Sequence, residues 1–155
     1  MQKVSPKIEI LIISIGSPLQ IGIYQEGKLI EAVRSKQKTS EVLLKLLMEL
    51  LDRYECASIF YTNGPGSYMA IKLTYITLRT LEMIKQIPFY GCDAFSLNRG
   101  NPIKAMGKLY FIKEKETIIT KKFDEAVEQR FDLPSMLSEA TLLEDNKPLY
   151  ILPAA

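Results

Sequence analysis

The stretch Thr62-Asn63-Gly64-Pro65-Gly66-Ser67-Tyr68-Met69-Ala70-Ile71-Lys72-Leu73 decides how this chain is expected to fold. The run before it, residues 58–62, is short and rich in β-branched and aromatic residues, which is typical of a buried strand. Glycine tolerates positive φ and proline fixes its own φ, so Gly64, Pro65 and Gly66 predict a turn. Ser67 is a natural N-cap for a helix over Tyr68–Lys85.

This turn leaves free N–H groups at the start of a helix, where anions can bind. A phosphate loop of the GxxxxGK[ST] kind needs a lysine and a serine or threonine after the glycines. Tyr68 and Met69 stand there instead. We therefore favour a tight turn with a helix cap as the local interpretation.

Composition sets the class of protein. The 155 residues fit one ordinary domain, and 47% hydrophobic with 25% charged residues is typical of a globular protein. The net charge of +2 implies no obligatory polyanion partner. No apolar run approaches the roughly 18 residues that span a bilayer, and Glu9 interrupts the early apolar run, so we expect neither a signal peptide nor a membrane segment.

The reactive side chains narrow the chemistry. The sequence has no histidine, which excludes His-based triads and imidazole metal ligands. Cys56 and Cys92 both lie beside strand-like segments, and we expect them to be buried, reduced thiols in a cytoplasmic protein. We expect no catalytic residue and no metal ligand in this chain.

Apolar patterning predicts the N-terminal elements. Residues 8–15 read as a strand buried on both faces, Leu19–Gln25 and 28–33 as two further strands, and 34–38 as a basic loop. A helix is expected from Thr39, capped by a hydroxyl. Its apolar stripe is wider than one packing face needs, which suggests a second packing partner, either a neighbouring helix or another subunit.

The helix at Tyr68–Lys85 also has two apolar sides. A short strand at residues 89–92 follows it, so we expect a parallel strand pair with a helical crossover. Asp93 is placed to cap a short helix. Beyond it the pattern predicts a hairpin of residues 107–114 and Thr117–Lys122, a helix at 124–131 and a last strand at 149–152. We divide the chain into an N-terminal lobe, 1–98, and a reduced C-terminal lobe, 99–155.

Several segments together resemble the TsaB (YeaZ) family, partner subunits in the threonylcarbamoyl modification of tRNA adenosine 37. The family hallmark, Gly-Pro-Gly-Ser-Phe-Thr-Gly-Leu-Arg-Ile, is similar to residues 64–73 here, with Tyr68 for the aromatic and Lys72 for the arginine. The Ile-Pro-x-x-Gly and Ser-Leu elements have counterparts at 87–91 and 94–97, and residues 148–154 resemble the family's Pro-x-Tyr-Leu-Arg close. The likeness covers roughly residues 8–98 and is thin afterwards.

The resemblance implies a fold and a role. The fold would be α/β and actin-like (ASKHA, ribonuclease H-like), a mixed sheet with antiparallel N-terminal strands, flanking helices and a reduced second lobe. The chain would be a non-catalytic subunit that binds a TsaD-like catalytic subunit through its two long helices, as a four-helix bundle. We expect these residues near that surface: Leu43, Leu47, Tyr68, Met69, Lys72, Ile76 and Arg79. For each of these residues, burial in the chain's own core is the alternative.

The same resemblance implies a TsaE-like ATPase in the larger complex, a homodimer of the isolated chain and only indirect contact with tRNA. Where family members usually have Ile-Asp-Thr-Ser, this chain has Ile13-Ser14-Ile15-Gly16-Ser17, without the acid. We therefore expect no cofactor bound by this chain alone, with ATP or ADP only in the complex. Gly64, Pro65, Gly66 and Ser67 would set the angle of the second helix.

Two alternatives stay open. One is an enzyme, either a degenerate ATP-binding kinase-like domain or a hydrolase, with Asp93, Asp124, Ser67 and Lys72 as candidates; a nucleophilic Ser67 would lack a histidine base. The other is direct tRNA binding through the basic residues Arg34, Lys36 and Lys38.

Overall fold

The computed structural model describes residues 6–151, and its centre is a five-stranded sheet in the order β3-β2-β1-β4-β5. β1 (Ile8–Ile13), β2 (Leu19–Gln25) and β3 (Lys28–Ser35) are antiparallel neighbours. β4 (Cys56–Gly64) pairs in parallel with β1 and with β5 (Phe89–Asp93). The predicted mixed sheet, with antiparallel N-terminal strands and a parallel pair, is confirmed.

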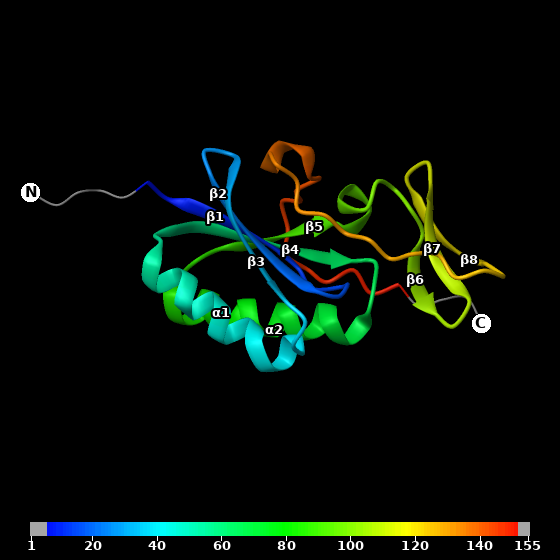
Figure 1. The fold of residues 1–155 in the computed structure, drawn as a ribbon, viewed down its shortest axis with the longest axis horizontal. Coiled ribbons are helices and arrows are strands. Elements are labelled where there is room, and N and C mark those ends of the chain that lie inside the picture. The colour runs from blue at the N-terminus through cyan, green and yellow to red at the C-terminus, as the bar shows by residue number, and fades with distance from the viewer. Residues whose placement is uncertain (1–5, 152–155) are drawn as a thin grey trace, which may run out of the picture.

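Two helices cover one face of this sheet (Figure 1). α1 (Thr39–Arg53) connects β3 to β4, and α2 (Tyr68–Lys85) connects β4 to β5. Neither helix within residues 6–151 is both long and apolar enough to cross a membrane. The predicted bounds of α2 agree with the structure at both ends.

β1 is buried on both faces, and its side chains alternate between two cores. Ile10 and Ile12 pack with the helices, whereas Leu11 and Ile13 pack with the second half of the chain. All four side chains are fully buried. A strand covered on both faces needs apolar residues at every position, which accounts for the nearly continuous apolar run.

The second half of the chain begins with a short 3-10 helix, η1 (Ala94–Leu97), whose first turn Asp93 caps by accepting from the Phe95 N–H at 3.1 Å. A three-stranded antiparallel sheet follows: β6 (Ile103–Met106), β7 (Leu109–Glu114) and β8 (Thr117–Lys122). The predicted hairpin of β7 and β8 is confirmed, and β6 was not predicted. A second 3-10 helix, η2 (Leu137–Glu139), lies near the β2–β3 turn.

The last described segment, residues 141–151, runs back along the parallel side of the five-stranded sheet, and we call it the C-terminal strap. The Gly91 and Asp93 N–H groups donate to the carbonyls of Asp145 and Thr141, and the Leu143 N–H donates to Gly91. The strap then reaches the end of β4, where the Leu149 N–H donates to the Asn63 carbonyl at 2.7 Å. It therefore covers the outer edge of β5 and reaches the turn before α2.

Several sequence predictions were wrong. Residues 124–131 form no helix, because Gln129 bonds across to Lys104 and Pro102 and Phe131 is buried against Gly16, which holds the segment extended. Residues 149–151 form no strand, and Leu152 lies outside the described residues. The capping position of α1 is Lys38, without a side-chain bond, so Thr39 is no hydroxyl cap. β3 continues through Arg34 and Ser35, so the basic loop is shorter than predicted.

Candidate functional site

The turn between β4 and α2 positions the start of the longer helix. The Ala70 N–H donates to Ser67 Oγ at 3.4 Å, and the Ile71 N–H donates to the Ser67 carbonyl at 3.0 Å. Pro65 is buried in this turn, and Gly66 lies so close to Ile15 that a Cβ on it would be 3.1 Å from that side chain. One turn further along α2, the hydroxyls of Thr74 and Ser14 are 2.7 Å apart, which ties the helix to the end of β1.

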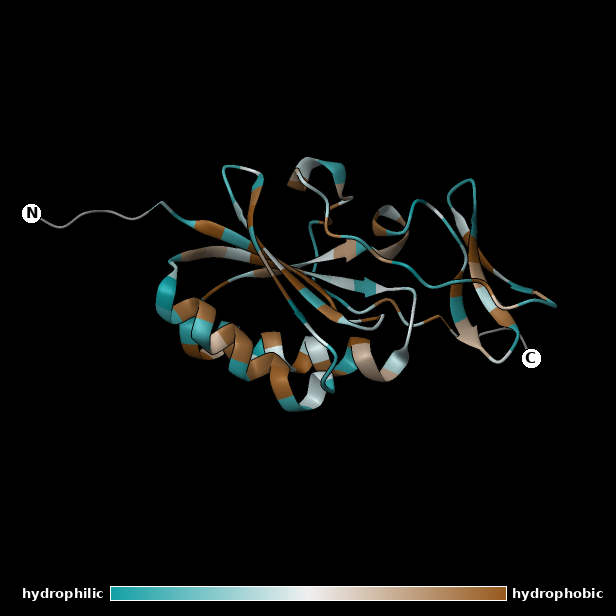
Figure 2. Ribbon diagram, viewed as in Figure 1, coloured by the Kyte–Doolittle hydropathy of each residue, from teal (hydrophilic) through white to brown (hydrophobic). Residues whose placement is uncertain are grey.

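The two sides of α2 have different environments although both are apolar. The inner side is buried against the sheet and consists of Ile71, Thr74, Leu78 and Leu81. On the outer side, Met69, Ile76, Met83 and Ile84 are 70%, 51%, 77% and 68% exposed; we call these four residues the α2 face. Figure 2 shows apolar residues along both helices. Large apolar side chains gathered on one exposed helix face mark a surface for another protein.

Not all predicted contact residues lie on this surface. Tyr68, Met69, Lys72, Ile76 and Arg79 are exposed on α2. Leu43 and Leu47 are 1% and 0% exposed, because α1 turns them towards the sheet, so the prediction that they lie at a partner surface was wrong.

The wide apolar stripe of α1 is used within the chain. Leu46, Met48, Leu51 and Tyr54 pack partly buried against the same core. Leu44 remains half exposed. The second packing partner inferred for α1 is therefore found to a large extent in this domain, and the excess apolar surface belongs to α2.

Positive charge borders the α2 face. Lys72 is exposed, and its Nζ lies 5.9 Å from the centroid of the Tyr68 ring. Arg79 is also exposed and pairs with Glu82 at 2.5 Å on the same helix. With Lys85, the charged residues of α2 sum to three cations and one anion. A protein that binds here is favoured if it presents carboxylates around its apolar contacts.

The C-terminal strap extends this surface beyond the first turn of α2. The Tyr150 ring packs on the Tyr68 ring with centroids 4.6 Å apart. Asn63 Nδ2 donates to the Lys147 carbonyl at 3.0 Å, and Tyr61 Oη donates to the Asn146 carbonyl at 2.7 Å. These bonds fix the strap against β4, and so they fix Tyr150 beside the helix.

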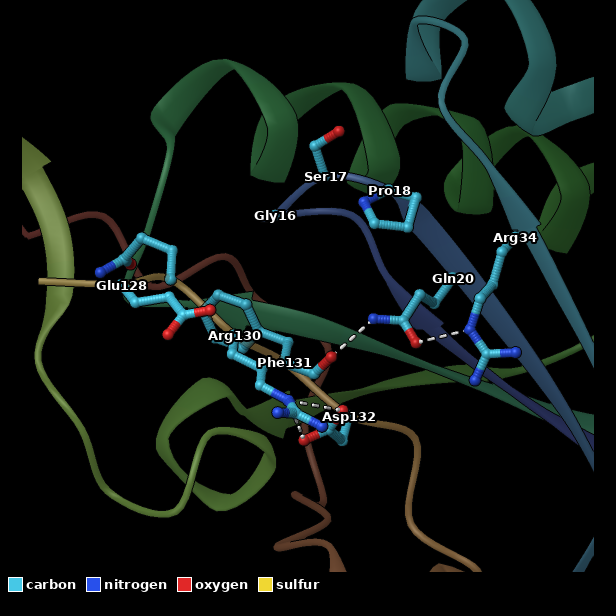
Figure 3. A pocket seen from close by; sticks show the side chains of 10 residues that line it. Gly16, Ser17, Pro18, Gln20, Arg34, Glu128, Arg130, Phe131 and Asp132 are labelled. Carbon is cyan, nitrogen blue, oxygen red and sulfur yellow. Dashed lines mark hydrogen bonds and ion pairs between the residues drawn. The ribbon is translucent and has the colours of Figure 1, made fainter.

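A second candidate site is a polar pocket of about 260 Å³ at the β1–β2 turn (Figure 3). It lies between that turn and residues 128–132, with Arg34, Arg130, Glu128 and Asp132 around it. Several of its polar groups already bind one another: Gln20 Nε2 donates to the Phe131 carbonyl at 2.6 Å, Arg34 Nε donates to Gln20 Oε1 at 3.3 Å, and Arg130 pairs with Asp132 at 3.3 Å. Ser14 bonds to α2 and is not among the residues that line it.

The two cysteine thiols are held in an unreactive, protonated state. Burial raises the pKa of Cys92 to about 12 and the pKa of Cys56 to about 12, both from 9.0. Thiols with such pKa values stay protonated at neutral pH, and a protonated thiol is a poor nucleophile. The Ser67 hydroxyl accepts the cap bond of α2.

Sequence reasoning missed several residues of the exposed surface. Met83 was not among the expected contact residues, although its spacing of seven and fourteen residues from Ile76 and Met69 places it on the same side of the helix as those two. Exposed Met106 and Tyr150 come from the second half of the chain, and no local pattern links them to α2.

Comparison with known proteins gives a fold. No family model matches this sequence, and no curated protein matches it. Two solved structures from Pseudomonas aeruginosa are similar: an uncharacterized protein with similarity to the peptidase YeaZ, at TM-score 0.60, and YeaZ, at TM-score 0.58. Each is 14% identical; both matches cover 81% of this chain, with 71% of the first structure and 72% of the second. The likeness to YeaZ expected from the sequence is thus confirmed, and this chain has the YeaZ fold.

Proposed function

We propose that this chain is a non-catalytic partner subunit that binds and activates a TsaD-like catalytic subunit for threonylcarbamoylation of tRNA adenosine 37. The observation that carries the proposal is the α2 face, four large apolar side chains exposed on a helix whose other side is fully packed. The YeaZ fold and the Gly64–Ser67 turn support the choice of family.

We infer an actin-like (ASKHA, ribonuclease H-like) fold with a reduced C-terminal lobe. The strand order β3-β2-β1-β4-β5, with three antiparallel strands followed by two parallel ones, supports this inference. In the proposed complex, α2 and α1 pack with two helices of the partner. Tyr68, Met69, Lys72, Ile76 and Arg79 make contacts, and Met83 and Ile84 join them.

The chain acts on its partner through binding, in a cytoplasmic complex. The same apolar face forms a homodimer when the partner is missing. A TsaE-like ATPase belongs to the larger assembly, ATP or ADP binds only there, and tRNA is held by the other subunits. Glycine and proline in the turn set the direction of α2, which supports a role in orienting helices at the interface.

The polar pocket at the β1–β2 turn favours a second candidate function, a degenerate ATP-binding kinase-like or hydrolase domain. Titration of the isolated chain with ATP, followed by a hydrolysis assay, distinguishes the two. Turnover of ATP by the chain alone contradicts the proposed subunit function.

Light scattering after size-exclusion chromatography tests the partner function, with the chain alone and with the TsaD-like protein of the same organism. We expect a stable heterodimer that Ile76→Asp abolishes. Ile30→Asp is the matched control, because Ile30 is 46% exposed on β3, away from α2, and this variant should bind normally. A wild-type chain that stays unbound contradicts the proposal.

A further inference from the structure

An apolar pocket of about 150 Å³ lies at the end of the α2 face. Four segments enclose it: the start of α2 with Tyr68, β6 with Ala105 and Met106, β7 with Phe111, and the C-terminal strap with Tyr150. None of the described residues that line it is charged. The pocket therefore forms where the three-stranded sheet, the start of α2 and the C-terminal strap meet.

The pocket opens to the protein surface through apolar side chains. Tyr68, Met106 and Tyr150 are 51%, 66% and 42% exposed, whereas Phe111 is buried behind them. Exposed apolar groups around a hollow lower the free energy when another apolar group enters and displaces water.

The walls are held in place before anything binds. The Leu149 N–H bond to Asn63 fixes the strap next to Tyr150, and the two tyrosine rings are in contact. Ala105 and Met106 belong to a strand paired with β7. A preformed pocket loses little conformational entropy on binding.

We propose that this pocket receives one apolar side chain of the protein that docks on the α2 face, and that a carboxylate next to that side chain pairs with Lys72. The inference rests on the proposed function, since the occupant belongs to the same partner. A cavity of about 150 Å³ holds one benzene-sized group, which fits a single leucine, methionine or phenylalanine side chain.

Charge complementarity identifies the kind of occupant. The Lys72 ammonium group lies over the Tyr68 ring at the border of the pocket, and α2 as a whole is cationic. Tyr68 and Lys72 lie on successive turns of α2, so one partner segment can reach the pocket and the ammonium group together. The occupant is therefore an apolar residue flanked by an acid.

Filling the pocket from this chain's own side tests the proposal. Ala105→Leu places a larger side chain in the space, and we expect affinity for the TsaD-like partner to fall roughly 10- to 100-fold, since the partner's side chain loses its burial. Ala32→Leu is the matched control, because Ala32 is exposed on β3. Affinity is measured by isothermal titration calorimetry, with thermal unfolding to verify that each variant folds.

A second variant covers the case in which Ala105→Leu does not fold. Met106→Asp puts a charge at the exposed mouth, and we expect a similar loss, while Lys72→Glu weakens binding further to partners that present acids. If the wild-type chain binds the partner and a folded Ala105→Leu chain binds it with the same affinity, the proposed role of the pocket is overturned. The proposed function then still stands. Wild-type chain that fails to bind overturns both.

Other occupants give other results. If Ala105→Leu abolishes self-association but not partner binding, the occupant is a second copy of this chain. If neither changes, the pocket takes no part in either contact. Either result overturns the proposal.

Discussion

The backbone oxygen of Leu149 lies against Gly64, so close that a Cβ built on this glycine would be 2.5 Å from it. Gly64 has φ +138°, a conformation that other residues rarely adopt. The turn before α2 and the C-terminal strap therefore require the same glycine, one for its conformation and the other for its missing side chain.

Replacing Gly64 by alanine should displace the strap. We expect Gly64→Ala to lower the free energy of unfolding by about 2–4 kcal/mol, from backbone strain and from the clash with Leu149. Gly107→Ala is the control, because Gly107 also has positive φ, +54°, with no neighbour near the added Cβ. Gly107→Ala should lower the free energy of unfolding by only about 1 kcal/mol. Urea denaturation measures both, and equal losses would show that the strap contact contributes nothing.

The Ser14–Thr74 hydroxyl pair should stabilise the attachment of α2 to β1. Ser14→Ala and Thr74→Val each remove one hydroxyl from a buried site, and a net hydrogen bond of this kind contributes about 1 kcal/mol. A double-mutant cycle of unfolding free energies should give a coupling of about that size. Strictly additive losses in the free energy of unfolding would show that the two hydroxyls do not stabilise each other.

Replacing leucines on the two sides of α1 should have very different effects on the free energy of unfolding. Leu47→Ala should lower the free energy of unfolding by about 2–5 kcal/mol, because Leu47 is fully buried. Leu44→Ala, at a half-exposed position one turn away, should change it by less than about 0.5 kcal/mol. Guanidinium denaturation of both variants decides this, and similar losses would contradict the burial of Leu47.

Stability should fall at alkaline pH because of the buried Cys92 thiol. Cys92 has its pKa raised by burial from 9.0 to about 12, so above pH 9 the unfolded chain loses a proton that the folded chain keeps. This thiol should lower the free energy of unfolding by about 1.4 kcal/mol between pH 8 and pH 10. Urea denaturation of wild type and Cys92→Ala isolates the effect, and identical pH slopes would argue against it.

Local patterns predicted most of the five-stranded sheet and both long helices. The Gly64–Ser67 turn follows a strand and caps a helix, and each of these features depends on neighbouring residues. The burial of Ile10, Leu11 and Ile12 on alternate faces of β1 was likewise predictable, because an apolar run of this kind indicates a strand covered on both faces.

Residues whose environment depends on distant contacts were predicted poorly. Leu43 and Leu44 are both leucines and adjacent in sequence, yet the packing of α1 buries the first and leaves the second half exposed. Gln129 bonds across to β6, which prevents the helix that residues 124–131 favour locally. The pocket near Tyr68 includes Tyr150, which no sequence spacing connects to α2.

The C-terminal strap has a consequence for synthesis on the ribosome. Tyr61 and Asn146, which bond to each other, are 85 residues apart, so β4 and β5 are translated long before their cover. At roughly 5–20 residues per second, the nascent sheet waits several seconds with the outer edge of β5 unprotected. A chaperone that shields exposed strand edges would have its opportunity in this interval.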